Sequence, residues 1–295
     1  MNSKRIFILN FLRHHLFIAF FIVVLIGCQK DTNEDNSSLP EQTQLNVAYG
    51  ADPLQKMDIY LPADRNSSST KVIITIHGGA WAQGDKSDFA PYIDTLKRRL
   101  PGYAIININY RLSNGTTVFF PAQENDVKAA LEFIYSKRSE FNISDKFALL
   151  GASAGGHLAL LQSYKYSSPV KIKAVVDFFG PTDMTDLYNN PASILVPSST
   201  IALIVGATPT TNPAIYQQSS PVNFVNAQSP PTIILHGGLD PVVSPNQSIA
   251  LKNLLQTAGV THEYVFYATE LHGWTGANLA DSFDKITAFL NANVN

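Results

Sequence analysis

From Leu45 onward, apolar runs alternate with segments in which apolar residues recur every three or four positions. Runs such as KVIITI and KFALL are continuous, which is typical of strands buried on both faces. Helical spacing is clear in PAQENDVKAALEFIYSKRSEF, where Val127, Ala130, Leu131 and Ile134 are apolar. We predict strands in KVIITIHGG, AIININYRL, KFALLG, KIKAVVDFFG, PTIILHGG and HEYVFYA. Helices are predicted in FAPYIDTLKRRL, from Pro121, after Ser153, at 245–258 and at 281–290.

This alternation predicts an α/β fold, with a mostly parallel central sheet and helices on both faces. A hairpin in LNVAYGADPLQKMDIYLPAD precedes the alternating part. In such sheets, ligands bind beyond the carboxyl ends of the strands. Residues 182–229 break the rhythm. Because a structureless loop of that length is unusual inside a domain, we expect them to form a small cap insertion packed over the strand ends.

The N-terminal segment has a different pattern. Lys4, Arg5 and Arg13 precede the apolar run LFIAFFIVVLIG, a layout typical of a secretory signal. The run is shorter than the roughly 20 residues that span a bilayer. It ends in LIGC, which resembles a bacterial lipobox with Cys28 as the acylated residue. We therefore predict a lipoprotein signal peptide at 1–27, a flexible polar tether at 28–44 and the folded domain at 45–295.

Composition and charge limit the classes of binding partner that we expect. The chain has 295 residues, with 21 basic and 23 acidic side chains and a formal net charge of −2, so nucleic acid is not an expected partner. The expected membrane contact is a lipid anchor at Cys28, which would place the protein in the cell envelope at the outer membrane. The QKD that follows resembles the acidic tags of lipoproteins exposed at the cell surface. Cys28 is the single cysteine, so no disulfide can form within the chain.

The stretch GASAG, residues 151–155, matches the G-x-S-x-G pattern of a nucleophile elbow. An apolar strand precedes it and the helix-like HLALL follows, which is the context that the motif requires. In such an elbow the serine is held on a tight turn next to a helix N-terminus, where developing negative charge is favoured. Ser153 is therefore the candidate nucleophile, and small neighbours permit the bend.

A serine hydroxyl needs a base that is itself oriented by an acid. Elbow enzymes place these residues in the chain order Ser, Asp or Glu, His. Asp240 follows PTIILHGGL and His272 follows HEYVFYATEL, both at carboxyl ends of predicted strands. We expect Asp240 to be the acid and His272 the base. Asp177 and Asp183 are rival acids, whereas we expect structural roles for four other histidines: His77, His157, His236 and His262.

Acyl transfer also needs donors for the oxyanion of the tetrahedral intermediate. The backbone N–H of Ala154, the residue after the serine, is one candidate. The other donor is expected from HGGAW, residues 77–81, with Gly79 and Ala80 as candidates. Trp81, Trp274 and Tyr110 could line the substrate pocket or lie in the core.

These residues give the chain a family resemblance. QKMDIYLP, HGGAWAQGDK, NYRLS, GASAGGHLA, HGGLDPVV and LHGW together resemble the α/β-hydrolase superfamily, near the hormone-sensitive-lipase-like esterases and the bacterial feruloyl and acetyl carbohydrate esterases. Many lipase-like members carry HGGG, whereas HGGAW with GDK is closer to the carbohydrate-esterase branch and to kynurenine formamidase. The resemblance implies ester hydrolysis by Ser153, Asp240 and His272, with no metal and no cofactor.

The expected function is a serine carboxylic-ester hydrolase that forms an acyl-enzyme. Its expected partner is a small-molecule or polysaccharide ester with a small acyl or aryl group, such as acetylated or feruloylated carbohydrate. Alternatives are an arylformamidase or a short-chain lipid esterase of the same fold, and a non-catalytic binding lipoprotein. The sequence specifies neither the ester nor the oligomeric state.

Overall fold

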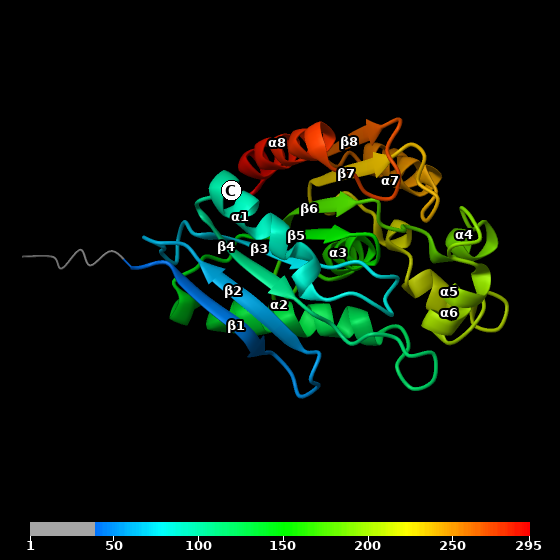
Figure 1. Ribbon diagram of the computed structural model, residues 1–295, viewed down its shortest axis with the longest axis horizontal. Helices are drawn as coiled ribbons and strands as arrows, with labels where there is room; N and C mark the ends of the chain where they lie inside the picture. The colour runs from blue at the N-terminus through cyan, green and yellow to red at the C-terminus, as the bar shows by residue number, and fades with distance from the viewer. Residues whose placement is uncertain (1–38) are drawn as a thin grey trace, which may run out of the picture. The chain divides into compact units, whose positions relative to one another are not determined.

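The computed structural model describes residues 39–295, in which eight strands form one sheet. The strand order is β1-β2-β4-β3-β5-β6-β7-β8. Strands β1 and β2 pair antiparallel with each other, β2 pairs antiparallel with β4, and the remaining pairs are parallel (Figure 1). The α/β-hydrolase fold predicted from the sequence is confirmed. The strands are β1 (Gln42–Ala48), β2 (Lys56–Leu61), β3 (Lys71–Ile76), β4 (Tyr103–Ile108), β5 (Phe147–Ala152), β6 (Ile172–Phe178), β7 (Thr232–Gly237) and β8 (His262–Tyr267).

Helices cover both faces of the sheet. The 3-10 turn η1 (Lys86–Phe89) and the helices α1 (Ala90–Arg99) and α8 (Gly276–Asn293) contribute apolar residues to the core on one face. The helices α2 (Ala122–Phe141), α3 (Ala154–Lys165) and α7 (Pro245–Thr257) contribute to the core on the other face.

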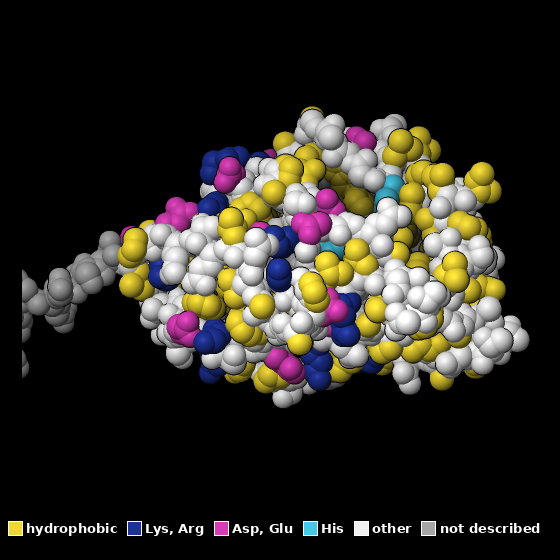
Figure 2. Space-filling view, turned by 60° about the horizontal axis from the view of Figure 1, so that its bottom comes forward, with side chains coloured by type: hydrophobic (Ala, Val, Ile, Leu, Met, Phe, Trp, Pro, Cys, Tyr) yellow, Lys and Arg dark blue, Asp and Glu magenta, His cyan; other side chains and the backbone are white. Residues whose placement is uncertain are grey.

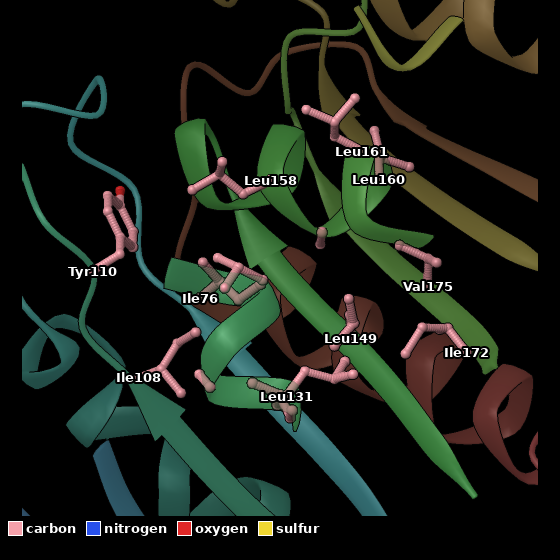
Figure 3. Close-up of a cluster of buried hydrophobic side chains, with 14 of the residues drawn as sticks. Ile76, Ile108, Tyr110, Leu131, Leu149, Leu158, Leu160, Leu161, Ile172 and Val175 are labelled. Carbon is pink, nitrogen blue, oxygen red and sulfur yellow. The ribbon is translucent and has the colours of Figure 1, made fainter. Parts of the chain in front are cut away.

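The continuous apolar strands follow from this two-sided burial. Successive side chains of a strand point to opposite faces, so Ile74 and Ile76 of β3 belong to one core while Ile73 belongs to the other. Figure 3 shows side chains of the first of these cores, among them Leu158 of α3 and Ile76 of β3. A strand that is buried on both faces is apolar at successive positions and does not alternate apolar and polar residues. These strands were therefore predicted from the length and continuity of their apolar runs.

The segment 182–229 forms four short helical elements. They are α4 (Met184–Asn189), α5 (Ser198–Val205), α6 (Pro213–Gln218) and the 3-10 turn η2 (Pro221–Phe224). Figure 1 shows α4, α5 and α6 beyond the arrowheads of β5 to β7. Their apolar side chains, such as Ile201 and Tyr216, join the core that contains α2 and α3.

Two element boundaries differ from the sequence-based expectation. Strand β1 begins at Gln42, inside the expected tether, because its backbone pairs with β2 from Leu61 onward. Helix α8 begins at Gly276 rather than near 281, although its first turn contains Gly276 and Asn278, which are weak helix formers. The predicted signal peptide, Cys28 and most of the predicted tether lie outside the described residues. Within residues 39–295, no helix combines the length and the apolar composition needed to cross a membrane.

Candidate active site

Ser153 lies in a sharp turn between β5 and α3. Its backbone has φ 55° and ψ −122°, a conformation that a non-glycine residue rarely adopts. A Cβ on Gly151 would lie 2.1 Å from the carbonyl oxygen of Gly155, so this position excludes any side chain. The Ser153 N–H donates to the carbonyl oxygen of Phe178 at 2.8 Å, which ties the turn to β6. The strain is of the kind that persists at functional sites because the surroundings enforce it.

The structure brings Ser153, His272 and Asp240 together from three separate segments. His272 Nε2 lies 2.9 Å from Ser153 Oγ, and His272 Nδ1 lies 2.6 Å from Asp240 Oδ2. The other carboxylate oxygen, Oδ1, accepts hydrogen bonds from the backbone N–H groups of Val242 at 2.7 Å and Val243 at 3.0 Å. The carboxylate is therefore fixed by its own loop and oriented toward the imidazole.

A second histidine, His236, contacts the same carboxylate. Its Nε2 lies 3.2 Å from Asp240 Oδ2 and 3.0 Å from the carbonyl oxygen of Val243, while its Nδ1 lies 2.6 Å from Ser248 Oγ. Burial opposes ionisation of Asp240, but the hydrogen bonds from His236 and His272 outweigh it and hold the pKa of Asp240 below its ordinary value. Sequence reasoning missed this contact with the site. The four-residue spacing of His236 and Asp240 across the loop after β7 was the available signal.

The rival acids lie elsewhere. Asp177 is fully buried at the end of β6, where its Oδ1 accepts from the backbone N–H of Gly180 at 3.0 Å. Asp183 is the N-cap of α4 and accepts from the N–H groups of Thr185 and Asp186. Each of these two acidic side chains thus has a local backbone partner, whereas the acid that contacts His272 is Asp240.

The HGGAW loop faces Ser153 across a space that we call the open cleft. The open cleft has a volume of about 340 Å³, and its lining residues are Gly78, Gly79, Ala80, Gln83, Ala152, Ser153, Phe179, Val242 and His272. Gly79 and Ala80 both have left-handed backbones, with φ 103° and 47°. Ala154 is the first residue of α3, and the N–H groups of a first helical turn have no acceptor within the helix. The candidate oxyanion donors thus lie on loops that meet at the serine.

A buried imidazole links this loop to the elbow helix and to the insertion. The Trp81 indole N–H donates to His157 Nδ1 at 3.1 Å, and His157 Nε2 lies 2.6 Å from the carbonyl oxygen of Ser219. Because that carbonyl can only accept, the imidazole proton lies on Nε2 and Nδ1 is free to accept. Burial lowers the pKa of His157 to about 4, so the ring is neutral near pH 7.

The candidate wall residues separate into two groups. Trp81 and Tyr110 are buried. Trp81 ends the HGGAW loop, and the Tyr110 hydroxyl donates to the carbonyl oxygens of His77 and Gly78, so Tyr110 supports the loop from the core. His77 also stacks on Tyr110, with 4.3 Å between the ring centroids. Trp274, by contrast, lies near His272 and lines an apolar pocket that shares Gly78, Ala152 and Phe179 with the open cleft.

Phe179 is a site residue that the sequence did not reveal. Its backbone has φ 43°, and its ring centroid lies 4.5 Å from that of His272. No residue of 182–229 is among the described residues that line the open cleft. The insertion packs its apolar residues beside α2 and α3 instead.

The geometry can move a proton from a hydroxyl to an imidazole. A serine, a histidine and a buried carboxylate in series at hydrogen-bond distances form the arrangement that activates a serine for attack on a carbonyl. Among residues 39–295, no group of three or more His, Cys, Asp or Glu side chains could hold a metal ion.

Comparison with known proteins places the chain in a family. The BD-FAE family model matches residues 57–255. The chain belongs to the BD-FAE family. The matched range contains Ser153 and Asp240 and ends before His272. The predicted membership of the α/β-hydrolase superfamily, near the carbohydrate esterases, is confirmed.

The relatives of this BD-FAE chain include esterases, and others are named as dipeptidyl peptidases. It is 27% identical over 264 residues to esterase LipC of Mycobacterium tuberculosis, which covers 83% of this chain and 64% of LipC. It is 31% identical over 236 residues to LipM of the same organism, which covers 76% of this chain and 53% of LipM. The chain thus spans between about half and two thirds of the length of these relatives. A solved carbohydrate esterase from gut microbiota, in truncated form, superposes with a TM-score of 0.72 at 29% identity, covering 85% of this chain and 95% of that one.

Proposed function

We propose that the protein is a serine carboxylic-ester hydrolase with Ser153 as the nucleophile, His272 as the general base and Asp240 as the orienting acid. The observation that carries the proposal is the pair of contacts on His272, at 2.9 Å to Ser153 Oγ and 2.6 Å to Asp240 Oδ2. The esterase relatives and the family membership support the same reaction class.

The reaction proceeds in two halves. His272 Nε2 takes the Ser153 proton while Oγ bonds to the ester carbonyl carbon, and the N–H groups of Gly79, Ala80 and Ala154 are the proposed donors to the resulting oxyanion. The intermediate then collapses, the alcohol leaves with the proton from His272, and an acyl-enzyme remains. Water, deprotonated by His272, then attacks the acyl carbon. The bond to Ser153 Oγ breaks, His272 returns the proton to Oγ, and the carboxylic acid is released.

The proposed substrates are esters of small acyl or aryl acids with a polar alcohol, such as acetylated or feruloylated carbohydrate. The carbohydrate esterase from gut microbiota supports this class, since it aligns with 85% of the chain. The open cleft also suits a polar alcohol, because exposed Gln83 lines it together with backbone groups of Gly78 and Gly79.

Covalent labelling tests the proposal. A fluorophosphonate probe should label the protein, and Ser153→Ala should abolish both the labelling and the hydrolysis of p-nitrophenyl acetate. Ser163→Ala is the matched control, because Ser163 lies in the same helix and donates to the carbonyl oxygen of Ala159 at 2.7 Å. Folded parent protein that neither reacts with the probe nor hydrolyses any ester would refute the assignment.

A further inference from the structure

The segment HGGLD begins in the last residues of β7 and ends at Asp240. Its two glycines allow close packing, since a Cβ on Gly237 would lie 2.2 Å from the carbonyl oxygen of Leu271 in the loop after β8. The glycines therefore explain how the loop that carries His272 comes close to the acid. They do not explain why the segment begins with a histidine, His236.

His236 is fully buried and has a polar partner on each side of its ring. Its Nδ1 lies 2.6 Å from Oγ of Ser248, and its Nε2 lies 3.0 Å from the carbonyl oxygen of Val243 and 3.2 Å from Oδ2 of Asp240. Because a carbonyl and an ionised carboxylate can only accept, Nε2 carries a proton, and Nδ1 accepts from the serine hydroxyl. Figure 2 shows histidine atoms at the edge of a surface hollow, whereas His236 has no exposed surface. It can therefore act only through its neighbours and not on a substrate.

The N–H group at Nε2 of His236 is the fourth N–H group around the Asp240 carboxylate. Oδ1 accepts from the backbone N–H groups of Val242 and Val243. Oδ2 lies 2.6 Å from Nδ1 of His272 and 3.2 Å from Nε2 of His236. The backbone bonds fix the orientation of the carboxylate, whereas the His236 N–H lies beside the oxygen that contacts the base.

Two N–H groups on one carboxylate oxygen share its negative charge. A carboxylate stabilises the protonated form of a neighbouring imidazole. A second N–H group beside the same oxygen offsets part of that stabilisation and so favours the neutral imidazole. The neutral imidazole is the form that takes the Ser153 proton. The His236 N–H should therefore keep the base in its active form at lower pH.

Few other groups act on the two imidazoles. The ring of Phe179 lies against both, with centroid distances of 4.5 Å and 6.4 Å. On α7, Gln247 donates to Oδ2 of Asp186 at 2.7 Å, which engages the carboxylate that α4 presents to that helix. Within residues 39–295, Asp240 is the one charged side chain in hydrogen-bond contact with either imidazole.

Resting on the proposed function, we propose that His236 is a positioning residue for the base: its buried N–H shares Oδ2 of Asp240 with His272 and thereby keeps His272 neutral at lower pH than the carboxylate alone would allow. His236 keeps its own proton throughout the reaction. Ser248 supports the tautomer that this role requires, because its hydroxyl donates to Nδ1.

Two carboxamide substitutions separate the N–H group from the rest of the ring. His236→Gln places an amide nitrogen near the position of Nε2, whereas the shorter side chain of His236→Asn extends only to the position of Nδ1. In His236→Asn, the acid limb of the kcat/KM profile for p-nitrophenyl acetate should move up by about 0.5–1 pH unit. Below that limb, kcat/KM should fall about three- to tenfold. On the alkaline plateau it should stay within about twofold of the parent, because the backbone bonds still orient Asp240. His236→Gln should restore the parent profile.

A histidine at the far end of β8 provides the control. His262→Asn should leave the acid limb in place, because Nδ1 of His262 contacts the carbonyl oxygen of Val260 at 2.8 Å and not the site. A purely structural role of His236 would lower kcat/KM by one factor at every pH. That result in folded His236→Asn, or an acid limb that does not move, would overturn the proposal. If His236→Asn does not fold, His236→Phe gives the same test, because it keeps a ring without the N–H group.

An NMR titration distinguishes failure of this role from failure of the hydrolase proposal. The His272 imidazole signal, assigned by its loss in His272→Gln, should titrate about 0.5–1 pH unit higher in His236→Asn than in the parent. This shift without ester turnover in the parent would support the effect of His236 on His272 and refute the hydrolase. Ser153-dependent turnover without the shift would refute the role of His236 and leave the hydrolase standing.

Discussion

The bond between Trp81 and His157 allows a quantitative prediction about the HGGAW loop. Trp81, like Ala80 before it, has a left-handed backbone, with φ 58°. Such a conformation costs about 1–2 kcal/mol for each non-glycine residue. Hydrogen bonds to the rest of the protein therefore hold the loop in this conformation. They include the bond from the Trp81 indole N–H to His157 and the bond from the Ser113 N–H to the carbonyl oxygen of Trp81 at 2.8 Å.

Trp81→Phe removes the indole N–H and keeps an aromatic ring. A neutral buried hydrogen bond contributes about 0.5–1.5 kcal/mol, so its loss should populate relaxed loop conformations in which an oxyanion donor is misplaced. Since about 1.4 kcal/mol of barrier corresponds to tenfold in rate, kcat for p-nitrophenyl acetate should fall by about two- to tenfold. KM should change by less than about twofold, because the donors act mainly on the transition state.

The measurement needs a readout that a general loss of stability would not change. Inhibition by a trifluoromethyl ketone, which forms a tetrahedral adduct, should weaken by the same factor as kcat. His157→Asn, which keeps an acceptor, should lose less activity than His157→Leu. Tyr103→Phe is the control, because it removes a bond to the carbonyl oxygen of Leu290 at 3.3 Å at a distance from the site. If Trp81→Phe lowers stability as Tyr103→Phe does but keeps kcat, the loop does not depend on the indole.

Two buried aspartates, Asp240 and Asp177, give further predictions. Asp240→Asn should lower kcat by about 10³–10⁴-fold, because the amide no longer fixes the His272 tautomer, and a loss below tenfold in a steady-state assay would contradict the proposed role. Burial raises the pKa of Asp177 from 3.8 to about 8, so the native state holds a proton that the unfolded chain releases in this range. The free energy of unfolding should therefore fall with rising pH, by up to about 1.4 kcal/mol per pH unit between those values. Asp177→Asn should remove this contribution, and denaturant titrations at pH 5 and pH 8 would refute it if parent and variant showed the same pH dependence.

The site residues that the sequence could predict are those that follow the carboxyl ends of strands. Ser153 and Asp240 each follow an apolar run that is continuous because both faces of its strand are buried, and His272 follows the edge strand β8. The carboxyl ends of parallel strands share one edge of the sheet, so chain order alone predicts that these side chains converge. Their contacts on His272, at 2.6 Å and 2.9 Å, follow that geometry.

Other parts of the site depend on packing that has no local signal. In the sequence, Phe179 is indistinguishable from the apolar residues of the buried strand before it. Its left-handed backbone, with φ 43°, turns the ring toward His272. An apolar pocket beside the open cleft lies between η1 and α1 on one side and α8 on the other, and most of the domain separates α8 from η1 and α1 in the chain. The position of the insertion 182–229 likewise depends on packing, because its apolar residues join the core that contains α2 and α3.

The small residues around Ser153 show how a local pattern can encode long-range contacts. The sequence suggested that they permit a tight bend, yet the one left-handed residue of the turn is Ser153 itself. A Cβ on Gly155 would lie 2.0 Å from the carbonyl oxygen of Ile76 in β3, and a Cβ on Gly156 would lie 2.2 Å from Oδ1 of Asp177 in β6. These two glycines let α3 start between the ends of β3 and β6, the strands on either side of β5, which brings the serine within reach of the HGGAW loop. The motif therefore specifies the packing of the elbow against the sheet as much as the bend of its own backbone.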